Sequence, residues 1–165
     1  MGEKMKKLKI AEPHNIKNIE MIEKFEEKNN ISSNTSSYLK TINQTTEKEE
    51  YEKIIYNSNE LDQILFIEEN NEIKDICHIQ GERDLKTCCI ILAQLKNKMK
   101  NREILSLATN YAFDYLGMND VFITAHNPAE YELIERAGFT SLGDNEGNTI
   151  FLKQKEDLIE YNKTI

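Results

Sequence analysis

The sequence is short of cysteine, and the few cysteines present exclude two classes of site. The three cysteines, Cys77, Cys88 and Cys89, form neither a CxxC pair nor a zinc-ligand spacing. They lie in apolar, strand-like segments, which favours reduced, buried thiols over disulfides. No His or Asn signature lies beside Cys88 or Cys89, so packing is a better interpretation than nucleophilic catalysis.

Long apolar segments are also missing. No apolar run approaches the length of a membrane span, and the N-terminus lacks the hydrophobic segment of a secretory signal. Gly2 follows Met1 as in a myristoylation signal, but Lys6 stands where Ser or Thr is required. We therefore expect a cytoplasmic protein without a membrane partner.

Basic residues are outnumbered by acidic ones, and the acidic excess is concentrated in one part of the chain. The formal net charge is -8, and residues 44–75 contain ten acids against three lysines. This charge disfavours nucleic acid as a partner. A small cationic or amine-bearing ligand suits such a field, and a solvated acidic face is the competing explanation.

The length of 165 residues, 39% of them hydrophobic, predicts one globular domain. We place this domain at residues 1–155, followed by a C-terminal tail at residues 156–165. Three runs with the two-residue period of strands are separated by turn-forming residues and predict an antiparallel meander at residues 61–68, 73–80 and 85–93.

Helical periodicity and a change to alternating helix and strand mark the rest of the chain. Apolar residues recur at helical spacing around residues 16–25, 38–42, 51–55, 102–116 and 128–137. Short strands are predicted at residues 8–11, 121–125 and 149–153, the last after a turn at residues 144–148. Asn127 is expected to cap the helix that Pro128 opens. An antiparallel start that passes into strand, helix and strand predicts a mixed sheet.

Residues 90–139 carry the most specific pattern: a strand, a lysine-rich loop, a helix, a second strand and a helix closing on Gly138 and Phe139. In this order and spacing the chain resembles the GNAT superfamily of acyl-CoA N-acyltransferases, over nearly its whole length. The resemblance implies a single-domain α/β (α+β) fold, with a mixed, mostly antiparallel sheet whose two splayed parallel central strands are flanked by helices. It implies acetyl-CoA or another acyl-CoA between those strands as co-substrate, and no metal.

The resemblance places the pyrophosphate of acyl-CoA on the loop before the long helix. The family pattern of Arg or Gln, two residues, Gly, one residue, and Gly or Ala falls on Lys96, Met99 and Asn101, and none of the three matches. Glycine lets the backbone approach an anion, whereas Met99 adds bulk there. Clustered cations oppose the helix dipole, which favours a bound anion over a solvated basic loop. The implied cofactor-binding residues are Leu92, Gln94, Lys96, Asn97, Lys98, Met99, Lys100, Asn101, Arg102 and Asn127.

Transfer to an amine needs a base for the ammonium and an acid for the leaving thiolate. The family's tyrosine acid corresponds to Ile134, while Tyr131 lies three residues earlier on nearly the same helix face, where packing on the sheet is the competing explanation. The candidates for the base are Glu82, in a turn where acids are usually turn formers, and His126, at the end of a splayed strand. His126 is better placed for a cleft than His78, although a lone histidine is often structural.

Two functions of different classes follow from the resemblance. The first is an acetyl-CoA-dependent N-acetyltransferase in which a small amine, or a protein lysine or N-terminal amine, attacks the thioester directly. The alternative is a catalytically inactive GNAT-like domain that binds a protein or another anion, which the glycine-free loop and Ile134 motivate. A homodimer is compatible with either hypothesis.

Overall fold

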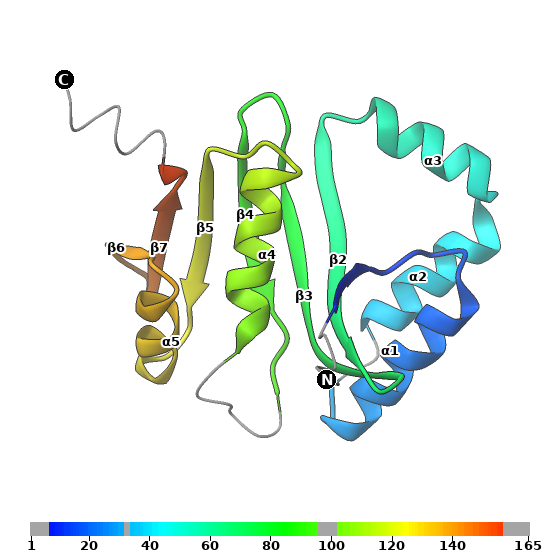
Figure 1. Ribbon diagram of the computed structural model, residues 1–165, viewed down its shortest axis with the longest axis horizontal. Coiled ribbons are helices and arrows are strands. Elements are labelled where there is room, and N and C mark those ends of the chain that lie inside the picture. The colour runs from blue at the N-terminus through cyan, green and yellow to red at the C-terminus, as the bar shows by residue number, and fades with distance from the viewer. Residues whose placement is uncertain (1–6, 32–33, 96–101, 157–165) are drawn as a thin grey trace, which may run out of the picture.

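A seven-stranded sheet forms the centre of the computed structural model, which describes residues 7–31, 34–95 and 102–156 (Figure 1). The strand order across the sheet is β1-β2-β3-β4-β5-β7-β6. Neighbouring strands are antiparallel except for β4 and β5, which are parallel. The strands are β1 (Lys7–Ile10), β2 (Glu60–Glu69), β3 (Glu72–Glu82), β4 (Thr87–Leu92), β5 (Asp120–Ala125), β6 (Thr140–Asn145) and β7 (Asn148–Gln154). The predicted mixed, mostly antiparallel sheet is confirmed.

Helices flank this sheet, as expected. In the described residues they are α1 (Ile16–Lys28), α2 (Asn34–Thr45), α3 (Lys48–Asn57), α4 (Glu103–Asp114), a 3-10 turn (Pro128–Glu130) and α5 (Tyr131–Arg136). α4 lies over the middle of the sheet, whereas α1, α2 and α3 gather beside β2 (Figure 1). None of the helices described is long and apolar enough to cross a membrane.

Two cores lie on opposite faces of the sheet. Side chains alternate along β2, so Ile64 and Phe66 pack with α1, whereas Leu65 and Ile67 pack with α4. In β4 only the α4 face is covered, and on the opposite face Ile91 is 48% exposed. The described residues therefore cover both faces of the sheet at β2 and β3, whereas at β4 they leave one face exposed.

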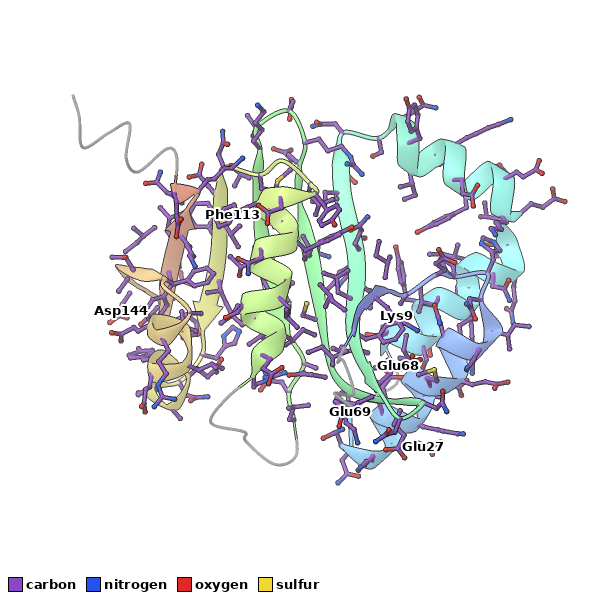
Figure 2. All side chains as sticks on the ribbon, in the orientation of Figure 1. Lys9, Glu27, Glu68, Glu69, Phe113 and Asp144 are labelled. Atoms are coloured by element: carbon purple, nitrogen blue, oxygen red, sulfur yellow. The ribbon has the colours of Figure 1, made fainter. Side chains whose placement is uncertain are left out.

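Local chemistry explains the meander and its ends. The β2–β3 hairpin turns at Asn70 and Asn71, which both adopt positive φ, the conformation that two-residue hairpins require. β1 adds to β2 at the edge of the sheet, where Lys9 contacts Glu68 at 2.7 Å (Figure 2). Gly81 in β3 faces Cys88 so closely that a Cβ there would lie 2.6 Å from the Cys88 Cα.

Several elements differ from the sequence prediction. β4 begins at Thr87 rather than at residue 85, because Lys86 takes a positive φ within the preceding turn. The helix predicted at residues 128–137 is a 3-10 turn followed by α5. β6 was not predicted; it forms a hairpin with β7 about Glu146 and Gly147, so the turn is tighter than residues 144–148. Of the predicted tail, residues 157–165 lie outside the described part of the chain.

Candidate active site

The parallel strands β4 and β5 are paired over three residues and then part. Thr87, Cys88 and Cys89 pair with Asp120, Val121 and Phe122, respectively. Beyond that point β4 continues to Leu92 on β3, and β5 continues to Ala125 on β7. The edges of β4 and β5 that face each other beyond Cys89 and Phe122 therefore have no strand partner in the described residues. Unpaired edges of this kind can hydrogen-bond an extended ligand that carries amide groups.

Asp62 and His78 meet on the face of the sheet that α4 does not cover. His78 Nε2 contacts the Asp62 carboxylate, and both side chains are half-buried. Tyr38, on α2, donates its hydroxyl hydrogen to the same carboxylate at 3.3 Å. A carboxylate, an imidazole and a phenol from three elements are thus brought together.

A β-bulge places Asp62 and His78 on one face. Next to the hairpin turn, Glu68 of β2 pairs with Ile73 of β3. One extra residue in β3 then shifts the register, so that Ile67 pairs with Asp75 and Ile64 lies opposite His78. Without this shift His78 would lie opposite residue 63, and its side chain would point to the other face from Asp62. The contact between Asp62 and His78 depends on the bulge.

A cavity of about 490 Å³ adjoins Asp62, between β2, α2, α3 and the segment that joins β1 to α1. Among the described residues, three carboxylates line it, those of Glu12, Glu52 and Asp62, against one lysine, Lys48. Its volume lies within the range of small-molecule sites. The cavity is therefore large enough for a small ligand and carries more negative than positive charge.

Two tyrosines in this cavity stay protonated at physiological pH. Burial raises the pKa of Tyr38 to about 12, and the nearby Asp62 carboxylate and Tyr51 add to the effect. The pKa of Tyr51 is also raised, first by burial and then by Asp62. Both phenols can therefore donate hydrogen bonds without adding charge to the cavity.

A smaller hollow of about 170 Å³ lies on the same face of the sheet. Ile64 lines both hollows, and the smaller one is also lined by His78, Ile91 and Leu92. Ile91 pairs with His78 across β3 and β4 and lies beyond the last residue of β4 that pairs with β5. His78 therefore lines the smaller hollow beside the unpaired end of β4 and contacts Asp62, which lines the acidic cavity.

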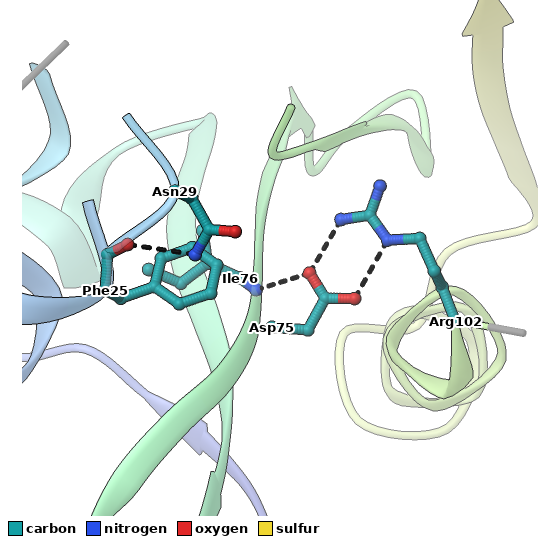
Figure 3. Close-up of polar contacts among 5 residues, drawn as sticks. All are labelled: Phe25, Asn29, Asp75, Ile76 and Arg102. Carbon is teal, nitrogen blue, oxygen red and sulfur yellow. Dashed lines mark hydrogen bonds and ion pairs between the residues drawn. The ribbon is translucent and has the colours of Figure 1, made fainter. Parts of the chain in front are cut away.

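The predicted cofactor residues of β4 and α4 lie at the open end of the strand pair. Leu92 is the last residue of β4 and points to the α4 face, and Gln94 is exposed. Arg102 is occupied by an ion pair: its Nε donates to Asp75 Oδ2 at 2.9 Å and its Nη2 to Asp75 Oδ1 at 2.6 Å (Figure 3). Asp75 also accepts the Ile76 backbone N–H at 2.8 Å. Arg102 therefore fastens the start of α4 to β3.

The remaining predicted cofactor residues of the loop, Lys96, Asn97, Lys98, Met99, Lys100 and Asn101, lie outside the described residues. Asn127 is described, and its side chain caps the 3-10 turn by accepting the Ala129 N–H at 3.0 Å. The capping role predicted for Asn127 is confirmed.

Tyr131 lies against β7. Its hydroxyl contacts Thr149 Oγ1 at 2.5 Å, and Thr149 in turn donates to Asp144. Because Thr149 uses its own hydrogen on Asp144, the Tyr131 hydroxyl is the donor in their contact. The ring packs edge-on against Phe151. Ile134, at the family's acid position, is fully buried.

The other two predicted catalytic residues lie at different places: His126 contacts the residue that precedes Thr149, whereas Glu82 lies at the closed end of the strand pair. His126 is exposed, and its Nδ1 contacts Asn148 Oδ1 at 3.1 Å. Glu82 is exposed at the end of β3 that pairs with Thr87, where β4 and β5 are closed.

As a candidate base, His78 ranked below His126 on the sequence alone, and Asp62 was not among the predicted site residues. An alternating strand pattern placed both residues in strands, but the pattern does not contain the bulge that turns them to one face. The concentration of acids in residues 44–75, which includes Asp62 and Glu52, was the available signal.

No protein-family model and no curated protein sequence matches this chain, but solved structures do. The N-acetyltransferase PseH of Campylobacter jejuni, solved with acetyl coenzyme A, has a TM-score of 0.63 at 17% identity and covers 92% of this chain and 99% of its own. The spermidine N-acetyltransferase of Vibrio cholerae has a TM-score of 0.64 at 14% identity, covering 96% and 99%.

A third similar structure is the Salmonella typhimurium acetyltransferase that modifies the N-terminal serine of ribosomal protein L7/L12, with a TM-score of 0.63 at 15% identity. It covers 93% of this chain and 96% of its own. At these identities the likeness shows the fold alone. The chain has the GNAT fold, the fold shared by acetyl-CoA-dependent N-acetyltransferases.

Proposed function

We propose that the protein is an acyl-CoA-dependent N-acetyltransferase that transfers an acetyl group to a primary amine. The observation that carries this proposal is the parting of β4 and β5 after three paired residues. Acetyl-CoA supplies an activated thioester when it is bound. The free edges of Ile90, Ile91 and Leu92 on β4 suit the amide groups of its extended arm.

The acceptor amine approaches, in this proposal, from the face of the sheet opposite α4. Ile91 is exposed on that face, and the acidic cavity lies on the same face at Asp62 and Ile64 of β2. Two of the similar structures belong to enzymes with amine acceptors, spermidine in one and a protein N-terminal serine in the other. The acceptor proposed here is accordingly a small amine, or a protein lysine or N-terminal amine.

Calorimetric titration with acetyl-CoA and with CoA tests the cofactor part of the proposal. Binding is expected, and its absence at millimolar ligand would refute both the cofactor and the enzyme. If binding occurs, reversing the charges of Lys96, Lys98 and Lys100 should weaken it far more than Tyr131→Phe does.

A matched control for the triple charge reversal is available on α1. Lys17, Lys24 and Lys28 are exposed there, and changing all three to Glu alters the net charge by the same amount. Acetyl-CoA binding by this control variant should equal that of the wild type. Equal losses in the two triple variants would mean that net charge, and not the loop, governs affinity.

An inactive GNAT-fold binding domain is the second candidate function. Its supporting observation is the acid position: Ile134 is buried and apolar, and the Tyr131 hydroxyl is engaged by Thr149. Release of free thiol from acetyl-CoA, measured over a panel of amines, separates the two candidates. Turnover by the wild-type protein would reject the inactive domain, and acetyl-CoA binding without turnover on any amine would favour it.

A further inference from the structure

We propose that the Asp62 and His78 pair takes the proton from the acceptor ammonium, and that the acceptor is a cationic amine held in the adjoining cavity of Glu12 and Glu52. This inference rests on the proposed function and assigns the acceptor side of the same site. It concerns residues of this chain that lie on the face of the sheet opposite α4.

His78 lies near both the acidic cavity and the unpaired end of β4. Its side chain lines the smaller hollow beside Ile91 and contacts Asp62, which lines the larger one. Ile91 belongs to the part of β4 that β5 leaves unpaired. A group placed at His78 can therefore face an amine on one side and an acyl donor along β4 on the other.

The hydrogen bond to Asp62 determines which ring nitrogen of His78 can accept a proton. Because a carboxylate only accepts, the His78 Nε2 must carry the hydrogen that lies between them. In the neutral ring the lone pair is then on Nδ1, for which the described residues offer no hydrogen-bonding partner. Asp62 fixes this tautomer and stabilises the positive charge that forms when Nδ1 accepts a proton.

The charge of the cavity favours a cationic acceptor. Glu12, Glu52 and Asp62 face one lysine, Lys48, so a cation entering the cavity gains favourable interactions. Besides Asp62 and His78, the titratable or charged groups among the described residues that line the two hollows are Glu12, His14, Glu26, Tyr38, Lys48, Tyr51, Glu52 and Cys77. Among them Glu26 is engaged by Ser36 and Thr35, and the two phenols remain neutral.

The proposed step balances without a further reactant. His78 Nδ1 removes one proton from the ammonium, which leaves a neutral amine. The amine nitrogen forms a bond with the thioester carbonyl carbon, and the carbon–sulfur bond then breaks. The second proton on nitrogen passes to the departing thiolate, and the proton on His78 is released to water. The products are an N-acetyl amine and free CoA thiol.

Binding of 1,4-diaminobutane, measured by calorimetry with and without CoA, tests the cavity. The diamine should bind, and the neutral 1,4-butanediol should not. Glu52→Gln should weaken diamine binding about tenfold, the loss of one favourable charge contact. Glu132→Gln, at an exposed position on α5, is the matched control and should bind the diamine as the wild type does. Failure of the diamine to bind in both conditions, or equal binding of the diol, would overturn the cavity assignment.

Steady-state acetylation of 1,4-diaminobutane tests the proton acceptor. His78→Gln should lower kcat about 10²-fold, the usual contribution of a general base. It should also abolish the acid limb of the pH profile, while acetyl-CoA affinity stays at the wild-type value. Asp62→Asn should lower kcat by less and shift that limb, as expected of a positioning residue. Circular dichroism would show that both variants remain folded.

The outcomes separate the two proposals. A wild-type enzyme that acetylates amines while His78→Gln keeps its rate and pH profile would overturn the proton-acceptor role and leave the proposed function intact. Loss of the pH limb in His126→Gln instead of His78→Gln would do the same. A protein that does not bind acetyl-CoA would refute the proposed function and with it the proton step, whereas diamine binding would still decide the cavity.

Discussion

The ion pair between Asp75 and Arg102 should be the electrostatic contact on which folding depends most. The Asp75 side chain is 4% exposed and that of Arg102 is 11% exposed, and two hydrogen bonds join them (Figure 3). The perturbation is Asp75→Asn, which keeps the shape of the side chain and removes its charge. The Arg102 guanidinium then remains buried without a counter-charge.

The magnitude follows from this burial. Removing one partner of a buried pair costs about 3–5 kcal/mol, because the remaining charge is uncompensated in a poorly solvated site. We expect about 3 kcal/mol for Asp75→Asn, since the amide oxygen can still accept one hydrogen bond from Arg102. For a chain of this length, that loss corresponds to a decrease in Tm of roughly 6–12 °C.

Urea unfolding followed by circular dichroism measures this loss, and the exposed pair of Lys9 and Glu68 provides the control (Figure 2). Side-chain exposure in that pair is 43% and 20%, so Glu68→Gln should cost about 0–1 kcal/mol. Replacing both Asp75 and Arg102 by Leu should cost less than the two single changes together, because neither charge is then left buried. A loss below 1 kcal/mol for Asp75→Asn, or additive losses in the double variant, would refute the reasoning.

Three further predictions concern packing, capping and thiol chemistry. Gly81→Ala should lower the free energy of unfolding by about 2 kcal/mol or more in urea, because its Cβ would lie 2.3 Å from the Thr87 carbonyl oxygen; an unchanged midpoint would contradict this. Asn127→Ala should cost about 1 kcal/mol in the same assay and Asn127→Gly only a few tenths, the difference expected of a cap. At pH 8, Ellman's reagent should leave Cys77 and Cys88 unlabelled in the folded protein, because burial raises both pKa values, that of Cys88 to about 12; labelling of either would show an exposed thiol.

The elements with strong local signals could be predicted from the sequence, and β6 could not. The β2 and β3 hairpin combines a two-residue apolar period with Asn70 and Asn71 at the turn, so pattern and turn chemistry agree. β6 is an edge strand whose side chains are exposed from Thr140 to Asp144, and its register with β7 shifts between Ser141 and Gly143, so that Leu142 is skipped. Its partner β7, and not its own pattern, makes it a strand.

Only part of the acidic side of the candidate site could be predicted from the sequence, and the reason is geometric. The charge of residues 44–75 suited either a cationic ligand or a solvated acidic face, and the cavity contains Glu52 and Asp62. His126 ranked above His78 because it ends a splayed strand, whereas His78 falls within a strand. A single bulged residue in β3 brings His78 to the Asp62 face. One-residue shifts of this kind leave no mark on an apolar pattern.

Arg102 makes a contact within the fold that does not require a bound phosphate. The family resemblance assigns this side chain to a phosphate site, whereas in the structure its Nε and Nη2 donate to Asp75 of β3. At the other end of residues 96–101, β4 is held by the same strand, through the pairing of Leu92 with Cys77 and the hydrogen bond from Ala93 to Ile76. β3 therefore holds the described residues on both sides of residues 96–101. The scaffold persists whether or not the loop binds pyrophosphate, so a measurement of acetyl-CoA affinity tests the chemistry of the loop independently of the fold.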